Sequence, residues 1–98
     1  MLIIEFFAHL KALGFYDDVR AGSREALRLD LPGKGAYLIV TDDALRIPDG
    51  TKPIFVGLYS KDGRQLESKV VTSFQAAFSC INRMLVQSGK TRTAEEGA

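Results

Sequence analysis

Two segments near the middle of the chain are apolar at almost every position. These segments, 36–41 and 54–59, lie between two others, 25–31 and 64–70, in which apolar and polar residues alternate. A strand that is apolar on both sides is covered on both faces, whereas an alternating strand has one solvated face. The pattern therefore predicts a four-stranded sheet with the two apolar segments at its centre.

When successive residues of these strands are assigned to opposite faces, the aromatic side chains fall on one face and most aliphatic side chains fall on the other. One face would carry Tyr37, Ile39, Phe55 and Tyr59. Antiparallel sheets with one open face usually keep that face polar, so a face rich in rings is expected to be covered by a loop or used for binding. The other face would be aliphatic and would meet the helices, with Leu27, Leu29, Leu31, Leu38, Val40, Ile54, Val56, Leu58, Leu66 and Val70.

Helical periodicity appears at both ends of the chain. From the first residues to Leu13 the apolar positions fall on one stripe, and Gly14 is placed to cap the helix C-terminus. A second stripe begins after Thr72, which with Gln75 three residues later fits a capping box. This helix is predicted to end at Gln87 or Ser88. The predicted stripes contain Leu2, Ile3, Phe6, Phe7, Leu10 and Leu13 in the first helix, and Phe74, Ala77, Phe78, Ile81, Met84 and Leu85 in the second.

Glycine and proline mark the connections. Pro-Gly-Lys-Gly at 32–35 and Ser-Lys-Asp-Gly at 60–63 are typical of hairpin turns. Segment 42–53 contains Pro-Asp-Gly and a second proline, which predicts a long surface loop. The polar segment 15–22 is predicted to be a connection with at most a short turn of helix. The predicted class is α+β, a two-layer sandwich of order α-β-β-β-β-α in which both helices pack on one face of a four-stranded antiparallel meander.

The length of 98 residues suits one domain with one core. We expect that domain to span residues 1–88 and to be followed by a flexible tail at 89–98, where no apolar residue is larger than alanine. The hydrophobic fraction of 46% and the net charge of +1 exclude a disordered chain and give no strong field toward nucleic acid or acidic lipid.

Composition also bears on the compartment. The apolar N-terminal residues lack a basic segment and a cleavage site, and Glu5 interrupts them, so neither a signal peptide nor a membrane span is expected. The single cysteine, Cys80, cannot form an internal disulfide. Together these features predict a cytoplasmic protein.

Candidate chemistry is sparse. Gly-Lys-Thr at 89–91 matches the end of a phosphate-binding P-loop, but Met84 stands where that motif needs glycine. A Cys80/His9 nucleophile pair would need adjacent helices and lacks a recognisable third residue; His9 also fits an ordinary helical pair with Glu5. We therefore predict no enzyme activity and no cofactor.

Two carboxylate pairs lie on connections, Asp17-Asp18 and Asp42-Asp43. They could bind a hard cation, but neighbouring carboxylates in loops are usually turn formers, and the spacing of a calcium loop is missing. No metal site is predicted.

The aromatic face carries the functional prediction. We expect a small protein-interaction domain, an accessory, adaptor or inhibitor protein, that forms a homodimer through Tyr37, Ile39, Phe55 and Tyr59. A separate, unidentified protein is the second expected partner. The alternative is a module that binds single-stranded nucleic acid or a small molecule on the same face. Nucleic acid is the less expected ligand, because Asp30 and Glu67 share the wet positions of Arg28 and Lys69.

Overall fold

A computed structural model gives the fold and describes residues 1–20, 24–33 and 35–97, without the side chains of 19, 20, 24 and 88–97. The chain forms two helices and five strands in the order α-β-β-β-β-β-α, which confirms the α+β class. The elements are α1 (Ile3–Leu13), β1 (Tyr16–Arg20), β2 (Arg24–Asp30), β3 (Tyr37–Asp42), β4 (Ile54–Tyr59), β5 (Gln65–Val71) and α2 (Phe74–Gly97).

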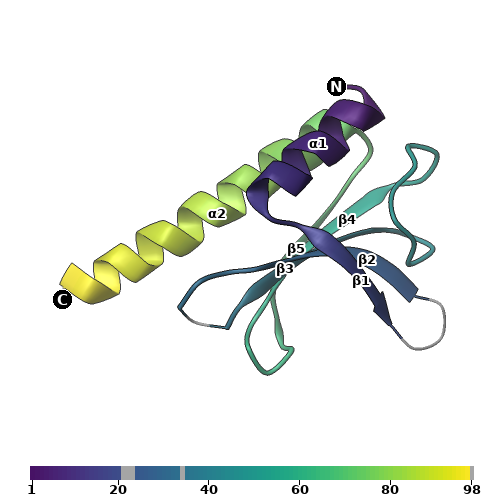
Figure 1. Cartoon of the computed structure of the whole chain (residues 1–98). Coiled ribbons are helices and arrows are strands. Elements are labelled where there is room, and N and C mark those ends of the chain that lie inside the picture. Colours follow the sequence, from purple (N-terminus) through teal and green to yellow (C-terminus); the bar gives the residue numbers. More distant parts are fainter. Residues whose placement is uncertain (21–23, 34, 98) are drawn as a thin grey trace.

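The five strands form one antiparallel sheet whose spatial order, β1-β2-β3-β4-β5, follows the chain. Figure 1 shows both helices on the same side of this sheet, with α1 against α2. We call the face toward the helices the inner face and the opposite face the outer face. The predicted meander and the placement of both helices are therefore confirmed, while the number of strands is five and not four.

The additional strand is β1, in the segment predicted to be an irregular connection. Apolar alternation does not reveal it, since its sequence is Tyr-Asp-Asp-Val-Arg. It pairs with β2, and polar side chains connect the two strands. The Tyr16 hydroxyl donates a hydrogen bond to Asp30 Oδ2 at 2.8 Å, and Asp18 Oδ2 lies 4.0 Å from Arg28 Nη1. A polar edge strand of this kind also discourages pairing with other chains.

The inner face carries the core, as the aliphatic pattern predicts. Burial of this apolar surface is the main favourable contribution to folding. Leu29 and Leu58 pack partly buried against the same cluster. The cluster contains Phe6, Leu10, Phe15, Leu27, Leu38, Val40, Ile54, Val56, Ala77, Cys80, Ile81 and Met84.

Strand β5 differs from the prediction in register. A β-bulge in β5 lies opposite Leu58 and Tyr59 and leaves Leu66 without a pairing partner on β4. It shifts the register of the rest of the strand, so that Ile54 pairs with Val71. Paired residues share a face, so Val71 packs on the core while Val70 turns to the outer face and is 61% exposed. The assignment of Leu66 and Val70 to the core was therefore wrong.

Both helix caps can be compared with the predictions. Gly14 caps α1 with a left-handed φ of 107°, as expected. At the start of α2, the backbone N–H of Ala76 donates to Ser73 Oγ at 3.1 Å. Ser73 is thus the capping residue, and the predicted cap at Thr72 was one position too early.

The long helix α2 runs 24 residues to Gly97, so the predicted end at Gln87 or Ser88 was wrong. Its C-terminal part projects beyond the sheet in Figure 1. Among the side chains of α2 that the structure describes, Leu85 is the last that packs on the core cluster. The boundary of the folded domain at residue 88 and the flexibility of 89–98 stay predictions.

Deleting residues 89–98 is expected to leave the melting temperature within about 2 °C of the full chain, because isolated helical turns contribute little without packing. Thermal unfolding followed by circular dichroism measures this. Deletion from Leu85 onward provides the contrast, since it removes a side chain that packs on the core and should lower the melting temperature by several degrees. A large loss from the shorter deletion would show that the terminal segment packs.

Candidate functional site

The outer face brings together the four residues predicted from the aromatic pattern. Tyr37 pairs with Tyr59 across β3 and β4, Ile39 pairs with Gly57, and Phe55 pairs with Thr41, so all lie on one side of the sheet. Tyr37 and Ile39 are buried, while Phe55 and Tyr59 are half-buried. In the described part of the chain, both helices lie on the other side, so this burial comes from neighbours within the sheet face itself.

A hollow of about 550 Å³ opens on this face. Its lining includes two small buried residues, Ala26 and Thr41, together with larger apolar and aromatic side chains. Small-molecule sites have volumes of this order. The hollow is lined by Asp18, Glu25, Ala26, Tyr37, Ile39, Thr41, Asp42, Asp43, Leu45, Pro53, Phe55, Tyr59, Gly63 and Val70.

Gly57 determines how the rings sit. A Cβ atom at this position would lie 2.7 Å from the ring of Phe55 and 2.8 Å from that of Tyr59. The two rings therefore lean over Gly57 from both sides along β4, and glycine inside a strand commonly marks such a close approach. An alanine here would have to displace both rings.

Tyr37 is enclosed between an arginine and another ring. The guanidinium carbon of Arg28 lies 4.0 Å from the ring centroid, and Tyr59 stacks on Tyr37 at 5.4 Å with an interplanar angle of 11°. Such cation–π and stacked contacts stabilise ring positions. Tyr37 is therefore a fixed wall of the hollow.

Arg28 is held in turn by carboxylates. Its Nε donates to Asp30 Oδ1 at 2.8 Å, and Tyr16 donates to the other oxygen of Asp30. These two donors, Tyr16 first, lower the pKa of Asp30, and the same bond raises the pKa of Tyr16. Asp30 stays ionised at neutral pH and keeps the arginine over the Tyr37 ring.

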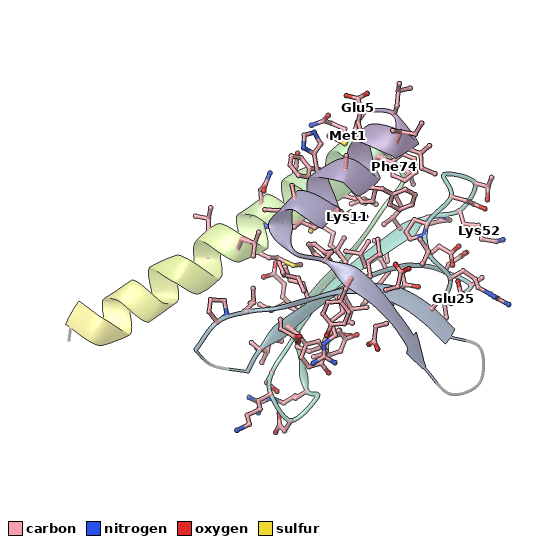
Figure 2. The ribbon with its side chains drawn as sticks, in the orientation of Figure 1. Met1, Glu5, Lys11, Glu25, Lys52 and Phe74 are labelled. Atoms are coloured by element: carbon pink, nitrogen blue, oxygen red, sulfur yellow. The ribbon has the colours of Figure 1, made fainter. Side chains whose placement is uncertain are left out.

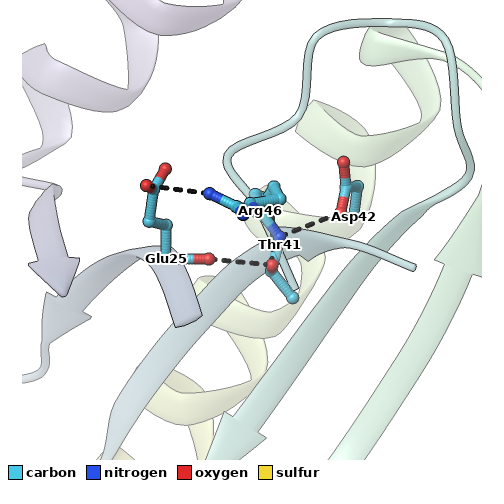
Figure 3. A network of polar contacts seen from close by, with 4 residues as sticks. All are labelled: Glu25, Thr41, Asp42 and Arg46. Carbon is cyan, nitrogen blue, oxygen red and sulfur yellow. Dashed lines mark hydrogen bonds and ion pairs between the residues drawn. The ribbon is translucent and has the colours of Figure 1, made fainter. Parts of the chain in front are cut away.

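The start of the 42–53 loop forms one end of the hollow (Figure 3). The carboxylate of Asp42 accepts the backbone N–H groups of Ala44 and Arg46 at 2.8 and 2.9 Å. The Thr41 hydroxyl lies 2.9 Å from the Arg46 carbonyl and 3.1 Å from that of Glu25, which share its one proton. Asp42 is 4% exposed, so these bonds are largely shielded from water.

The same turn presents Leu45 at the rim. Leu45 has a φ of 59°, and its carbonyl accepts the backbone N–H of Glu25 at 2.9 Å. A branched apolar residue rarely adopts this left-handed conformation. The sequence left open whether a loop covers the aromatic face; in the structure the 42–53 loop contributes Asp43, Leu45 and Pro53 to the wall of an open hollow.

The described lining of the hollow has one sign of charge. It includes four carboxylates and, among the residues that the structure describes, no lysine or arginine. Arg46 and Arg28 lie nearby in ion pairs, Arg46 with Glu25 at 3.3 Å. Figure 2 shows Glu25 and Lys52 at the right-hand end of the sheet. The pKa of Asp49 in the same loop is lowered mainly by hydrogen bonds from Thr51 and to a smaller extent by the charge of Lys52. The acidic residues of the described lining are Asp18, Glu25, Asp42 and Asp43. Strand alternation places Glu25 on the side of Leu27, and Asp42 pairs with Ile54 of the core, so these two residues line the hollow at the edge of the outer face.

The other candidate residues are placed apart from this face. The His9 ring stacks on Phe78 at 4.9 Å, and Cys80 is buried in the core cluster. Desolvation raises the pKa of the Cys80 thiol, which disfavours the thiolate that a nucleophile needs. The side chains of the P-loop-like segment 89–91 lie outside the described residues. Within the described ranges, no group of three or more His, Cys, Asp or Glu residues is arranged to hold a metal ion.

Sequence reasoning missed several residues of the hollow. Val70 was assigned to the core because the bulge in β5 cannot be read from the alternation of apolar and polar residues. Residues 70 and 71 are both valine, so the sequence allows either of them to face the core. Asp18 was missed as a wall residue because β1 was not recognised. Leu45 and Pro53 come from an irregular loop, whose path periodicity cannot predict.

None of the helices in the described part of the chain is long and apolar enough to cross a membrane. Comparisons with protein-family models, with curated proteins and with solved structures give no match to this chain.

Proposed function

We propose that this chain is a small, non-enzymatic, cytoplasmic binding domain that contacts another protein through the outer face of its sheet. The observation that carries the proposal is the hollow, which gathers Tyr37, Ile39, Phe55 and Tyr59 on a face that the two helices leave open. Apolar surface of this kind on a small domain is typical of an interaction site.

The arrangement of the face supports binding by a rigid surface. The Arg28–Asp30–Tyr16 bonds fix one side of the hollow, and the Asp42 turn fixes the opposite end. A surface that is ordered before binding loses less conformational entropy when a partner docks. Exposed apolar side chains continue around the hollow at Leu45 and Val70.

Self-association is the first form of this proposal to test. Val70→Lys places a charge on the outer face at a position 61% exposed, so the monomer should fold normally. If two copies meet through this face, each substitution acts twice, and the dimer should weaken at least tenfold. Sedimentation velocity over a range of micromolar concentrations measures the dissociation constant.

Ser79→Lys is the matched control, because it adds the same charge on an exposed position of α2, on the helix side of the molecule. It should leave any dimer unchanged. Phe55→Lys tests the aromatic anchor itself, with circular dichroism to confirm the fold. A dimer that responds equally to Ser79→Lys and Val70→Lys would place the contact elsewhere.

The alternative predicted from the rings, a nucleic-acid platform, has less support. Base stacking on a protein is normally accompanied by basic residues that follow the phosphates. The described lining of the hollow instead contains four acidic residues and no lysine or arginine. Its volume and apolar lining also fit a small molecule, which makes such a ligand the second candidate function.

A further inference from the structure

We infer that the hollow receives, from a separate protein, a peptide segment in which a lysine or arginine stands next to an apolar side chain. This inference rests on the proposed function and names the partner's chemistry. It follows from the exposed carboxylate at the rim of the hollow, from the apolar lining and from the mismatch between this face and a copy of itself.

The charge of the lining selects a cation. Among the four acidic residues of the described lining, Asp18 and Glu25 lie in ion pairs with Arg28 and Arg46, and the buried carboxylate of Asp42 accepts two backbone N–H groups. Asp43 is exposed at the loop end of the hollow, next to its apolar lining. An incoming ammonium or guanidinium group can pair with this carboxylate, whereas an anion would be repelled there.

The apolar lining favours an apolar side chain. It combines the small side chain of Ala26 with the apolar surface of Ile39 and Phe55. Leu45, which is 44% exposed on its left-handed turn, extends this apolar surface at the rim. An aliphatic or aromatic side chain inserted between these walls would exclude water from several apolar groups.

A second copy docked face to face is a poor occupant for the same reasons. A two-fold contact places the same surface on both sides, so two hollows would oppose each other and leave space unfilled. It would also bring the carboxylates of one rim near those of the other. Like charges that approach in this way weaken association. A partner with a convex, basic and apolar segment has neither problem.

Two synthetic peptides provide the probe: a capped decapeptide that alternates lysine with leucine and phenylalanine, and the same peptide with glutamate for lysine. Amide chemical shifts of the isotope-labelled full chain report both affinity and location. We expect the lysine peptide to shift the amide resonances around Ile39, Thr41 and Asp43. Its affinity should fall several-fold when the salt concentration rises from 20 to 200 mM. The glutamate peptide should leave those resonances unchanged.

Asp43→Asn should weaken the lysine peptide about two- to fivefold, as expected for an exposed ion pair. The matched control is Asp17→Asn, which removes the same charge from an exposed residue paired with Leu27, on the opposite side of β1 from Asp18. Asp17→Asn should leave the affinity unchanged. Val70→Lys should also lower the affinity for the lysine peptide, because it adds a positive charge to the lining of the hollow.

The outcomes separate this inference from the proposed function. Equal binding of the two peptides at the hollow overturns the charge preference and leaves the face as a binding site. If the chain binds neither peptide but forms a dimer that Val70→Lys disrupts, the inference of a separate protein partner is overturned and the proposed interface is supported. A monomer that binds neither peptide overturns both.

Discussion

Replacing Phe6 with alanine is expected to lower the free energy of unfolding by about 3 to 5 kcal/mol. Phe6 is fully buried, and its ring lies 4.9 Å from that of Phe74 at the start of α2 and 5.9 Å from that of Phe7. The substitution would leave a cavity at the point where α1, α2 and the sheet meet. Because a domain of this size has little stability to lose, the variant would be largely unfolded at modest urea concentrations.

Urea unfolding followed by circular dichroism measures the effect. Ile4→Ala is the matched control, since Ile4 lies on the same helix and is 78% exposed. That change should shift the midpoint only slightly, because alanine is also the better helix former. Equal midpoints for the two variants would mean that α1 does not pack on the core through Phe6.

Replacing Asp42 with alanine is expected to cost about 2 to 3 kcal/mol. Its carboxylate accepts two backbone N–H groups within a largely buried turn, and the loss leaves both donors without that partner. The turn also holds Leu45 at its positive φ, so the rim of the hollow should loosen together with the loss of stability.

Asp42→Asn separates the hydrogen bonds from the charge. The amide oxygen can still accept from Ala44 and Arg46, so this variant should lose less than half as much stability as the alanine variant. Thermal and urea unfolding measure both. If Asp42→Ala is no less stable than Asp43→Ala at the neighbouring exposed position, the turn does not depend on this carboxylate.

The sheet interior was predictable from sequence because burial on two faces leaves a direct trace. Every residue of β3 is buried, and the apolar run from Tyr37 to Val40 indicates this for the first four of them. The separation of aliphatic and aromatic residues gave the correct faces for β2, β3 and β4, and with them Tyr37, Ile39, Phe55 and Tyr59. In these strands hydrophobic patterning and tertiary structure agree.

The parts that were missed depend on interactions that patterning does not record. Strand β1 is maintained by side-chain bonds from Tyr16 and Asp18 to residues on β2, ten or more positions away. The register of β5 depends on a bulge at Leu66. The positions of the Phe55 and Tyr59 rings depend on Gly57, because a side chain there would collide with both rings.

The sequential order of the strands bears on how the chain folds. Each strand pairs with its neighbour in the chain, so the whole sheet can form from local hairpins, and such topologies fold quickly. The inner face is different, since Ala77, Ile81 and Met84 arrive with α2, after all five strands. A chain emerging from the ribosome can thus build its sheet early while the aliphatic face waits for a cover. Helix α1 can cover part of that face from the start, and the part that α2 covers is the surface on which chaperones, or other nascent chains, would act until α2 docks.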